Sequence, residues 1–157
     1  MKASMSVVPT LAALLLLAAC SEPSSTDLLE SRITATMMPS QTCNQPANVQ
    51  AVPNGIQVGV PDRSLFVIGR SDLSDCGRYA LTGVVEAMLD PRIMQVVVLP
   101  GGNINEPEAL LLHQRTATVQ AFLSNAGYTG TQPPVLVQQS AGPMGSWGIV
   151  LAVAGQQ

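Results

Sequence analysis

FVIGRSDLSDCGRYAL, residues 66–81, carries the strongest local signal for how this chain folds. Its first residues belong to a nearly continuous apolar run over 64–69, which predicts a buried central strand. Ser74 is a favourable N-cap residue, and Asp75 places a negative charge in the turn that follows it. The stretch therefore predicts a strand, a short polar turn and the start of a helix.

Apolar residues continue this helix along one face. They fall at positions i, i+3, i+4, i+7 and i+8, which is the spacing of a single buried stripe. The stripe consists of Leu81, Val84, Val85, Met88 and Leu89. Pro91 blocks any continuation of the helix beyond the stripe, because proline has no backbone N–H and clashes with the preceding turn.

The same kinds of signal predict the remaining elements. They are an edge strand over 56–60, a buried strand over 93–99, a helix over 105–126, and strands over 134–137 and 147–153. Pro61 ends the edge strand, and Asn105 can cap the second helix. The order strand, helix, strand, helix, strand, strand predicts an α/β fold, a two-layer sandwich with a mixed sheet and two helices on one face.

The N-terminal segment is typical of an export signal. Lys2 gives it a positive start, and residues 7–17 form an apolar run that is too short to span a bilayer as a mature helix. The sequence LAAC at 17–20 closes the run and resembles the lipobox of bacterial lipoproteins at all four positions. The resemblance implies cleavage before Cys20 and lipidation of its thiol, so that acyl chains hold the protein to a membrane. An ordinary secretory signal with a chance cysteine is the alternative.

The lipobox resemblance also suggests a location and a division of the chain. Ser21 stands where an aspartate tends to retain lipoproteins in the inner membrane, so the resemblance implies the outer membrane, on its periplasmic face. Residues 1–19 are then the signal peptide. Residues 20–54 are rich in Ser, Thr, Pro, Gln and Asn and predict a flexible linker. Residues 55–157 form the predicted domain.

The two remaining cysteines, Cys43 and Cys76, form an even pair in an oxidising compartment. A disulfide between them would pin the N-terminal segment to the start of the first helix. A free reactive thiol is the alternative. No Cys-x-x-Cys occurs, and the single histidine, His113, cannot complete a zinc site with its neighbours in sequence, so we expect no metal and no cofactor.

Charge and composition exclude further classes of partner. Lys2 is the one lysine, so the chain after the signal carries six arginines against ten carboxylates, a net charge of −4. There is no basic run, and nucleic-acid binding therefore has no electrostatic support. Aromatic residues make up only 3% of the chain, which means that the core must be built from aliphatic side chains.

Small motifs over residues 64–153 resemble the OmpA-like C-terminal domain family. Residues 66–81 look like its opening strand and first helix, and Val96-Val97-Val98 followed by Gly101 resembles its second strand. Residues 111–117, LLHQRTA, followed by Val119, Leu123 and Gly127, resemble its second helix. The resemblance implies the OmpA-like βαβαββ fold and a place in the bacterial envelope.

Members of that family bind peptidoglycan through an aspartate and an arginine that grip the peptide stem. Arg115 matches the arginine, whose guanidinium can fork onto a carboxylate. Asn103 lies where the aspartate is expected and brings no charge, and Leu111-Leu112 replaces the family's Leu-Ser. Alternatively, Arg115 is a solvated flank residue at the edge of the helix stripe, where arginine stems often pack.

Signals for other chemistry are weak. Asp72 and Asp75 flank the helix start and are better explained as capping residues than as a catalytic pair. No Gly-x-Ser-x-Gly motif occurs, and no nucleophile with a base is recognisable, so we expect that the protein is not an enzyme. Trp147 follows a glycine-rich stretch and is either a contact for a protein partner or a core residue.

Two functions remain. The first is an outer-membrane lipoprotein that serves as a structural subunit of an envelope-spanning secretion or pilus machine, where the strand over 56–60 would offer an edge to a partner. The second is a lipoprotein that tethers the outer membrane to peptidoglycan. The partners are accordingly the membrane through Cys20, protein subunits of an envelope complex, and peptidoglycan in the second case.

Overall fold

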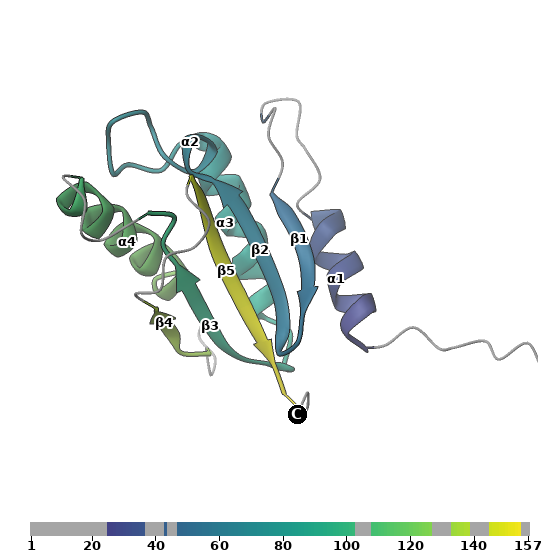
Figure 1. Cartoon of the computed structure of the whole chain (residues 1–157). Coiled ribbons are helices and arrows are strands. Elements are labelled where there is room, and N and C mark those ends of the chain that lie inside the picture. Colours follow the sequence, from purple (N-terminus) through teal and green to yellow (C-terminus); the bar gives the residue numbers. More distant parts are fainter. Residues whose placement is uncertain are drawn as a thin grey trace, which may run out of the picture.

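The computed structural model describes residues 25–36, 43, 47–102, 108–126, 133–138 and 145–154. Their elements follow the order α1 (Ser25–Thr36), β1 (Asn48–Val52), β2 (Gly55–Pro61), α2 (Asp62–Leu65), α3 (Asp75–Met88), β3 (Ile93–Leu99), α4 (Ala109–Ser124), β4 (Val135–Val137) and β5 (Ser146–Val153). Figure 1 shows the strands side by side in one sheet with the helices against it. The signal segment 1–19, Cys20, Asn103 and Asn105 lie outside the described residues.

The sheet has the strand order β1-β2-β5-β3-β4, which puts the last strand of the chain in the middle. β3 and β4 are parallel, and the other neighbouring pairs are antiparallel. The expected mixed sheet is therefore confirmed, as are the strands over 93–99 and 147–153 and the short strand at Val135–Val137.

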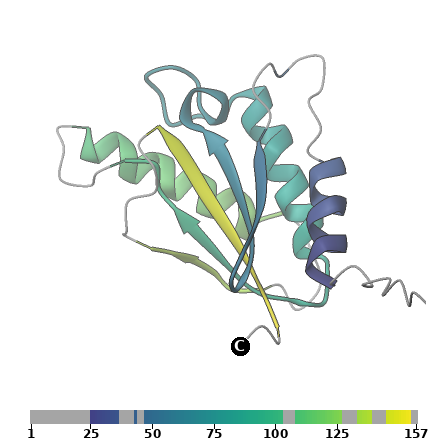
Figure 2. The same ribbon diagram turned by 45° about the vertical axis from the view of Figure 1, so that its right-hand side comes forward.

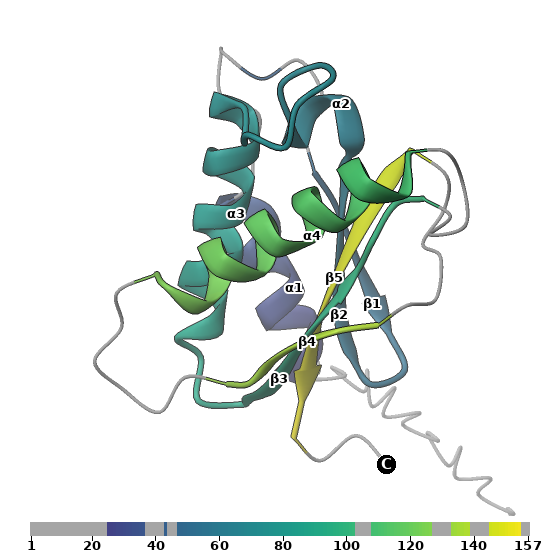
Figure 3. The ribbon, with the colours of Figure 1, turned by 90° about the vertical axis from the view of Figure 1, so that its left-hand side faces the viewer.

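Three helices cover one face of this sheet. Figure 3, a view along the sheet, shows α1, α3 and α4 together on one side. The core between the layers includes Ile56, Val58, Val60, Val96, Val98, Ile149 and Leu151 from the sheet and Leu29, Ile33, Leu81, Val84, Val119 and Leu123 from the helices. The two-layer α/β sandwich is confirmed, with α1 added to the two expected helices.

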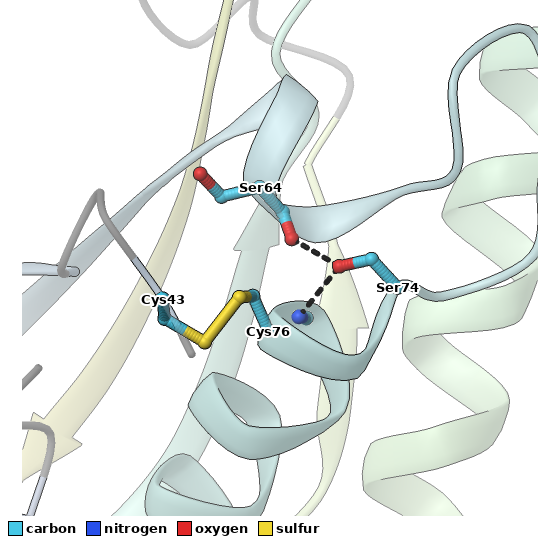
Figure 4. Close-up of a disulfide and its surroundings, with 5 residues drawn as sticks. Cys43, Ser64, Ser74 and Cys76 are labelled. Atoms are coloured by element: carbon cyan, nitrogen blue, oxygen red, sulfur yellow. Dashed lines mark hydrogen bonds between the residues drawn. A yellow bond between two sulfur atoms is a disulfide. The ribbon is translucent and has the colours of Figure 1, made fainter. Parts of the chain in front are cut away.

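The start of α3 follows the sequence prediction closely. The Ser74 hydroxyl oxygen accepts a hydrogen bond from the Gly77 backbone N–H at 2.9 Å, which caps the helix. The same hydroxyl donates to the Ser64 carbonyl oxygen, as Figure 4 shows. Gly77 is needed here because a Cβ at this position would lie 2.0 Å from the Leu65 carbonyl oxygen. The first turn of α3 therefore packs directly on the backbone of α2.

The disulfide between Cys43 and Cys76 is confirmed. The two Cα atoms lie 5.5 Å apart, and the bridge joins positions 33 residues apart in the sequence. Figure 4 shows the bridge reaching α3 at its first turn, beside the Ser74 cap. The segment that precedes β1 is thus fixed to the beginning of α3.

The predicted central strand over 64–69 is wrong. Residues Asp62–Leu65 form a single helical turn, and Phe66 makes an isolated antiparallel bridge with Leu73. Leu65 and Phe66 are buried, but Ile68 is 90% exposed at the tip of the connection. A short apolar run does not reveal its own period, and here it spans a helical turn and a loop. The central strand is β5 instead.

The prediction of an edge strand over 56–60 is also wrong, because β2 has neighbours on both sides. β1 pairs with it in register from Asn48↔Gly59 to Val52↔Gly55, and β5 pairs with its other side. Gly55, with φ at 151°, makes the tight turn between β1 and β2 possible. No edge is available at 56–60, and the strands at the two edges are β1 and β4.

The predicted flexible linker over 20–54 needs a correction as well. α1 and β1 both belong to the folded domain, and Leu29 and Ile33 of α1 are buried in its core. These two residues are four positions apart, so one helix face carries both even though the segment as a whole is polar. Figure 2 shows α1 alongside α3. The described domain therefore begins at residue 25 rather than 55.

Smaller differences concern helix ends. α4 is described from Ala109 to Ser124, with Glu108 at the N-cap position and no side-chain capping bond. The expected buried stripe of α3 is confirmed for Leu81, Val84, Val85 and Met88, but Leu89 lies beyond the helix end and is exposed.

Candidate functional site

The arginine singled out from the sequence, Arg115, lies on α4 and turns toward the loop after α2. Its Nη1 donates to Asp62 Oδ2 at 2.8 Å and to Asp62 Oδ1 at 3.1 Å. Its Nε donates to the Arg70 carbonyl oxygen at 2.9 Å. The Arg115 side chain is only 12% exposed, so it is not a solvated flank residue. The guanidinium is instead an internal link between α4 and α2.

Asp62 is the centre of this link. It follows β2 directly, and its backbone N–H donates to the Gly145 carbonyl oxygen at 2.9 Å, which fixes the start of α2 beside β5. Its Oδ1 also accepts a hydrogen bond from the Trp147 indole Nε1 at 2.9 Å. One carboxylate thus accepts hydrogen bonds from both the Arg115 guanidinium and the Trp147 indole N–H.

Two aromatic rings enclose the pair. Phe66 and Trp147 pack edge to face, with ring centroids 5.2 Å apart and planes at 64°. The Arg115 guanidinium carbon lies 4.8 Å from the centroid of the Phe66 ring, a cation–π contact. Trp147 is fully buried. The prediction that Trp147 contacts a partner is therefore wrong, and the alternative, a core residue, is right, because its ring fills the space between β5 and α2.

These four residues, Asp62, Phe66, Arg115 and Trp147, form what we call the Asp62 network. It joins α2, the following loop, α4 and β5. Asp62 accepts hydrogen bonds from Arg115 and Trp147, and the Arg115 guanidinium packs over the Phe66 ring. The charge of Arg115 is met by Asp62 within the domain. The arrangement is that of a stabilising ion pair, and Asp62 was not identified from the sequence as its partner.

The other residues considered from the sequence do not join the network. Asp72 pairs with Arg70 on the surface, and Asp75 sits in the first turn of α3. His113 is exposed on α4. Within the described residues, no group of three His, Cys, Asp or Glu side chains could hold a metal ion. Across the same residues, no helix combines the length and apolarity needed to cross a bilayer.

A second charged cluster lies at the turn from α3 to β3. Asp90 accepts hydrogen bonds from Arg92 through its backbone N at 3.0 Å, Nε at 2.9 Å and Nη2 at 2.8 Å. Arg32 of α1 approaches the same carboxylate, with Nη1 at 3.7 Å from Oδ2. The side-chain hydrogen bonds from Arg92 are the main reason that the pKa of the buried Asp90 falls from 3.8 to about 2. This cluster holds the first helix to the end of α3.

Comparison with known proteins identifies the fold. No family model matches the chain, and no curated protein matches it. A putative MotB-like protein from Desulfovibrio vulgaris is 12% identical, with a TM-score of 0.57 over 85% of this chain and 94% of its own. The cell wall anchor of the type VI secretion system from Pseudomonas aeruginosa is 15% identical, with a TM-score of 0.52 over 83% and 98%.

The periplasmic domain of MotB from Helicobacter pylori is 12% identical, with a TM-score of 0.52 over 69% of this chain and 89% of that domain. At these identities the likeness concerns the fold. It agrees with the α/β sandwich described above and with the motifs found over residues 64–153. The chain has an OmpA-like fold, the one expected from those motifs.

Proposed function

We propose that this protein is an outer-membrane lipoprotein, anchored through Cys20, that serves as a structural subunit of an envelope-spanning assembly such as a secretion or pilus machine. The lipobox-like sequence supports the anchor and the periplasmic location. The OmpA-like fold supports a place in the envelope. The observation that carries the choice between the two functions is the ion pair between Arg115 and Asp62.

In a wall-binding domain, the arginine of this helix would be needed for a carboxylate of the peptide stem. Here the Arg115 guanidinium is already paired with Asp62, and the Phe66 ring covers one face of the guanidinium. A stem carboxylate would have to displace Asp62, which would leave that carboxylate and the Trp147 N–H without their present partner. The second ligand of the family site is also replaced, because Asn103 brings no charge. Both changes weaken peptidoglycan binding.

Exposed apolar side chains beside the Asp62 network favour a protein partner. Ile68 is 90% exposed at the tip of the loop that carries Arg70, and Val67 beside it is also exposed. The backbone of this loop is held by Arg115, since its Nε binds the Arg70 carbonyl oxygen. A fixed loop with a protruding isoleucine suits insertion into an apolar pocket of another subunit.

Peptidoglycan binding is the second candidate. It is favoured by the likeness to a cell wall anchor and by the presence of Arg115 at the matching position. We propose no enzymatic activity for either function.

Cosedimentation with purified sacculi separates the two candidates. The full protein and the Arg115→Lys variant are mixed with sacculi after both have been shown to melt cooperatively. The structural role predicts that neither protein pellets above a control without sacculi. Pelleting of the wild type that is lost in Arg115→Lys would instead establish the wall-binding role.

The assembly role has its own test. The tagged full chain is isolated from cross-linked envelopes, and the size of its complex is compared for the wild type, Ile68→Asp and Leu136→Asp. Leu136 is an exposed apolar residue on β4 and serves as the matched control. We expect a large complex that is lost in Ile68→Asp and kept in Leu136→Asp. A wild type that remains monomeric in the envelope would contradict the proposal.

A further inference from the structure

One end of the domain gathers the start of α1, the turn from α3 to β3 and the end of β5. α1 runs antiparallel to α3, because the Tyr79 hydroxyl donates to the Thr36 carbonyl oxygen at 3.2 Å while Arg32 pairs with Asp90 at the far end of α3. The backbone N–H of Ala154 donates to the Arg92 carbonyl oxygen at 2.9 Å. Figure 1 shows these parts at the bottom of the molecule, and we call this the anchor end.

The chain between the proposed lipid and the anchor end is very short. Only four residues separate Cys20 from Ser25, where α1 begins. Even a fully extended chain cannot place these two Cα atoms more than about 18 Å apart, at ~3.6 Å per residue. α1 is not free to lengthen the connection by unwinding without cost, because Leu29 and Ile33 are buried in the core. A lipidated Cys20 would therefore keep the anchor end close to the bilayer.

The anchor end exposes large apolar side chains from three different elements. Leu28 on α1 is 57% exposed, Leu89 after α3 is 54% exposed, and Met94 on β3 is 61% exposed. Leu28 lies one helical turn before Arg32, on the side of α1 that faces Asp90. Leu89 directly precedes Asp90. Leu28 and Leu89 thus lie beside this charged cluster, and Met94 follows Arg92 by two residues at the start of β3.

The charges at this end suit contact with a bilayer of ordinary composition rather than a strongly anionic surface. Arg32 and Arg92 share Asp90, and Asp27 in the first turn of α1 adds another negative charge. Arginine stems can lie along an interface while their charged heads remain in water. The apolar side chains, and not net charge, would therefore carry the contact.

We propose that the anchor end lies against the bilayer that receives the acyl chains of Cys20, with Leu28, Leu89 and Met94 in the membrane interface. The inference rests on the lipid anchor of the proposed function. It fixes the orientation of the domain, because the 14 residues of α3 rise about 20 Å away from this end. The loop with Ile68 and the Asp62 network then faces away from the membrane, toward other subunits.

Photo-cross-linking of the full protein in a Gram-negative host tests this orientation. Benzoylphenylalanine replaces Leu28, Leu89 or Met94, and Ile68 is the control because it is more exposed than any of them and lies at the other end of α3. After irradiation, protein–phospholipid adducts are measured by mass spectrometry. We expect at least about tenfold more adduct at the three anchor-end positions than at position 68. Equal yields, or none at the anchor end, would overturn the inference.

A labelled-palmitate experiment separates this inference from the anchor itself. The wild type is expected to incorporate the label, and Cys20→Ser is expected to lose it. Label on the wild type without lipid adducts at Leu28, Leu89 and Met94 would overturn the orientation and leave the anchor standing. Absence of label from the wild type would overturn both. Folding of each variant is verified by the Cys43–Cys76 bridge on a non-reducing gel.

Discussion

Asp62 and Arg115 are 53 residues apart in the sequence and form an ion pair with a distance of 2.8 Å from Oδ2 to Nη1. The pair joins the first turn after β2 to the middle of α4, and Trp147 adds a third element through its hydrogen bond to the same carboxylate. The arginine that the sequence singled out as a candidate ligand-binding residue is thus paired within the domain, where it links α4 to α2.

Loss of the Asp62 carboxylate should destabilise the domain. Asp62→Ala leaves the largely buried Arg115 guanidinium without its counter-ion and the Trp147 N–H without its acceptor. Asp62 itself remains partly exposed, so we expect a loss of about 1–3 kcal/mol rather than the full cost of a buried charge. Urea unfolding measures the change.

The matched control for this change is Asp72→Ala. In the wild type, Asp72 pairs with Arg70, and both side chains are exposed. Such surface ion pairs contribute only about 0–1 kcal/mol to stability. A similar decrease in the free energy of unfolding for Asp62→Ala and Asp72→Ala would show that the Asp62 network has no special role in stability.

Gly77→Ala should lower stability although alanine is the better helix former. Helix propensity alone favours alanine by about 1 kcal/mol. The added Cβ would meet the Leu65 carbonyl oxygen at 2.0 Å, and that backbone atom cannot move without disturbing α2. We expect a net loss of about 1–3 kcal/mol in thermal or urea unfolding. Gly102→Ala is the control, since its Cβ would meet only ordinary contacts with the Leu112 side chain at 3.5 and 3.6 Å.

Removal of the disulfide should cost about 2–4 kcal/mol, because the bridge closes a loop between positions 33 residues apart and restricts the unfolded chain. Cys43→Ser/Cys76→Ser is compared with the wild type by thermal unfolding without reductant. In reductant the wild type should approach the double variant. Equal melting temperatures of the wild type and the double variant without reductant would contradict a stabilising role for the bridge.

Acid should weaken the domain through Asp90. Its folded-state pKa is depressed to about 2, so its contribution is fully present above the unfolded pKa near 4 and is lost as the pH falls toward 2. The linked free energy of unfolding is about 2 kcal/mol. Asp90→Asn should therefore be less stable than the wild type at pH 6 by a similar amount and should show a flatter decline between pH 5 and pH 2. An identical slope in both proteins would refute this assignment.

Local features of the sequence were sufficient to predict several elements of the fold. The Ser74 cap, the apolar stripe from Leu81 to Met88 and the proline after it define α3, because capping and helical periodicity act within a few residues. Residues 93–99 form a strand as predicted, and Cys43 and Cys76 pair as their number suggested. The motif LLHQRTA over residues 111–117 also singled out Arg115 as a candidate site residue.

Tertiary contacts decided the rest. Leu29 and Ile33 become core residues only because α3 and the sheet offer them an apolar surface, although the segment around them has the polar composition of a linker. Residues 64–69 are apolar enough for a strand, but β5, from the far end of the chain, takes the central position. The sequence by itself determined which residues could form α3, β3 and the disulfide. Only the folded chain decided that Arg115 binds Asp62, since that choice depends on a contact across 53 residues that no local pattern encodes.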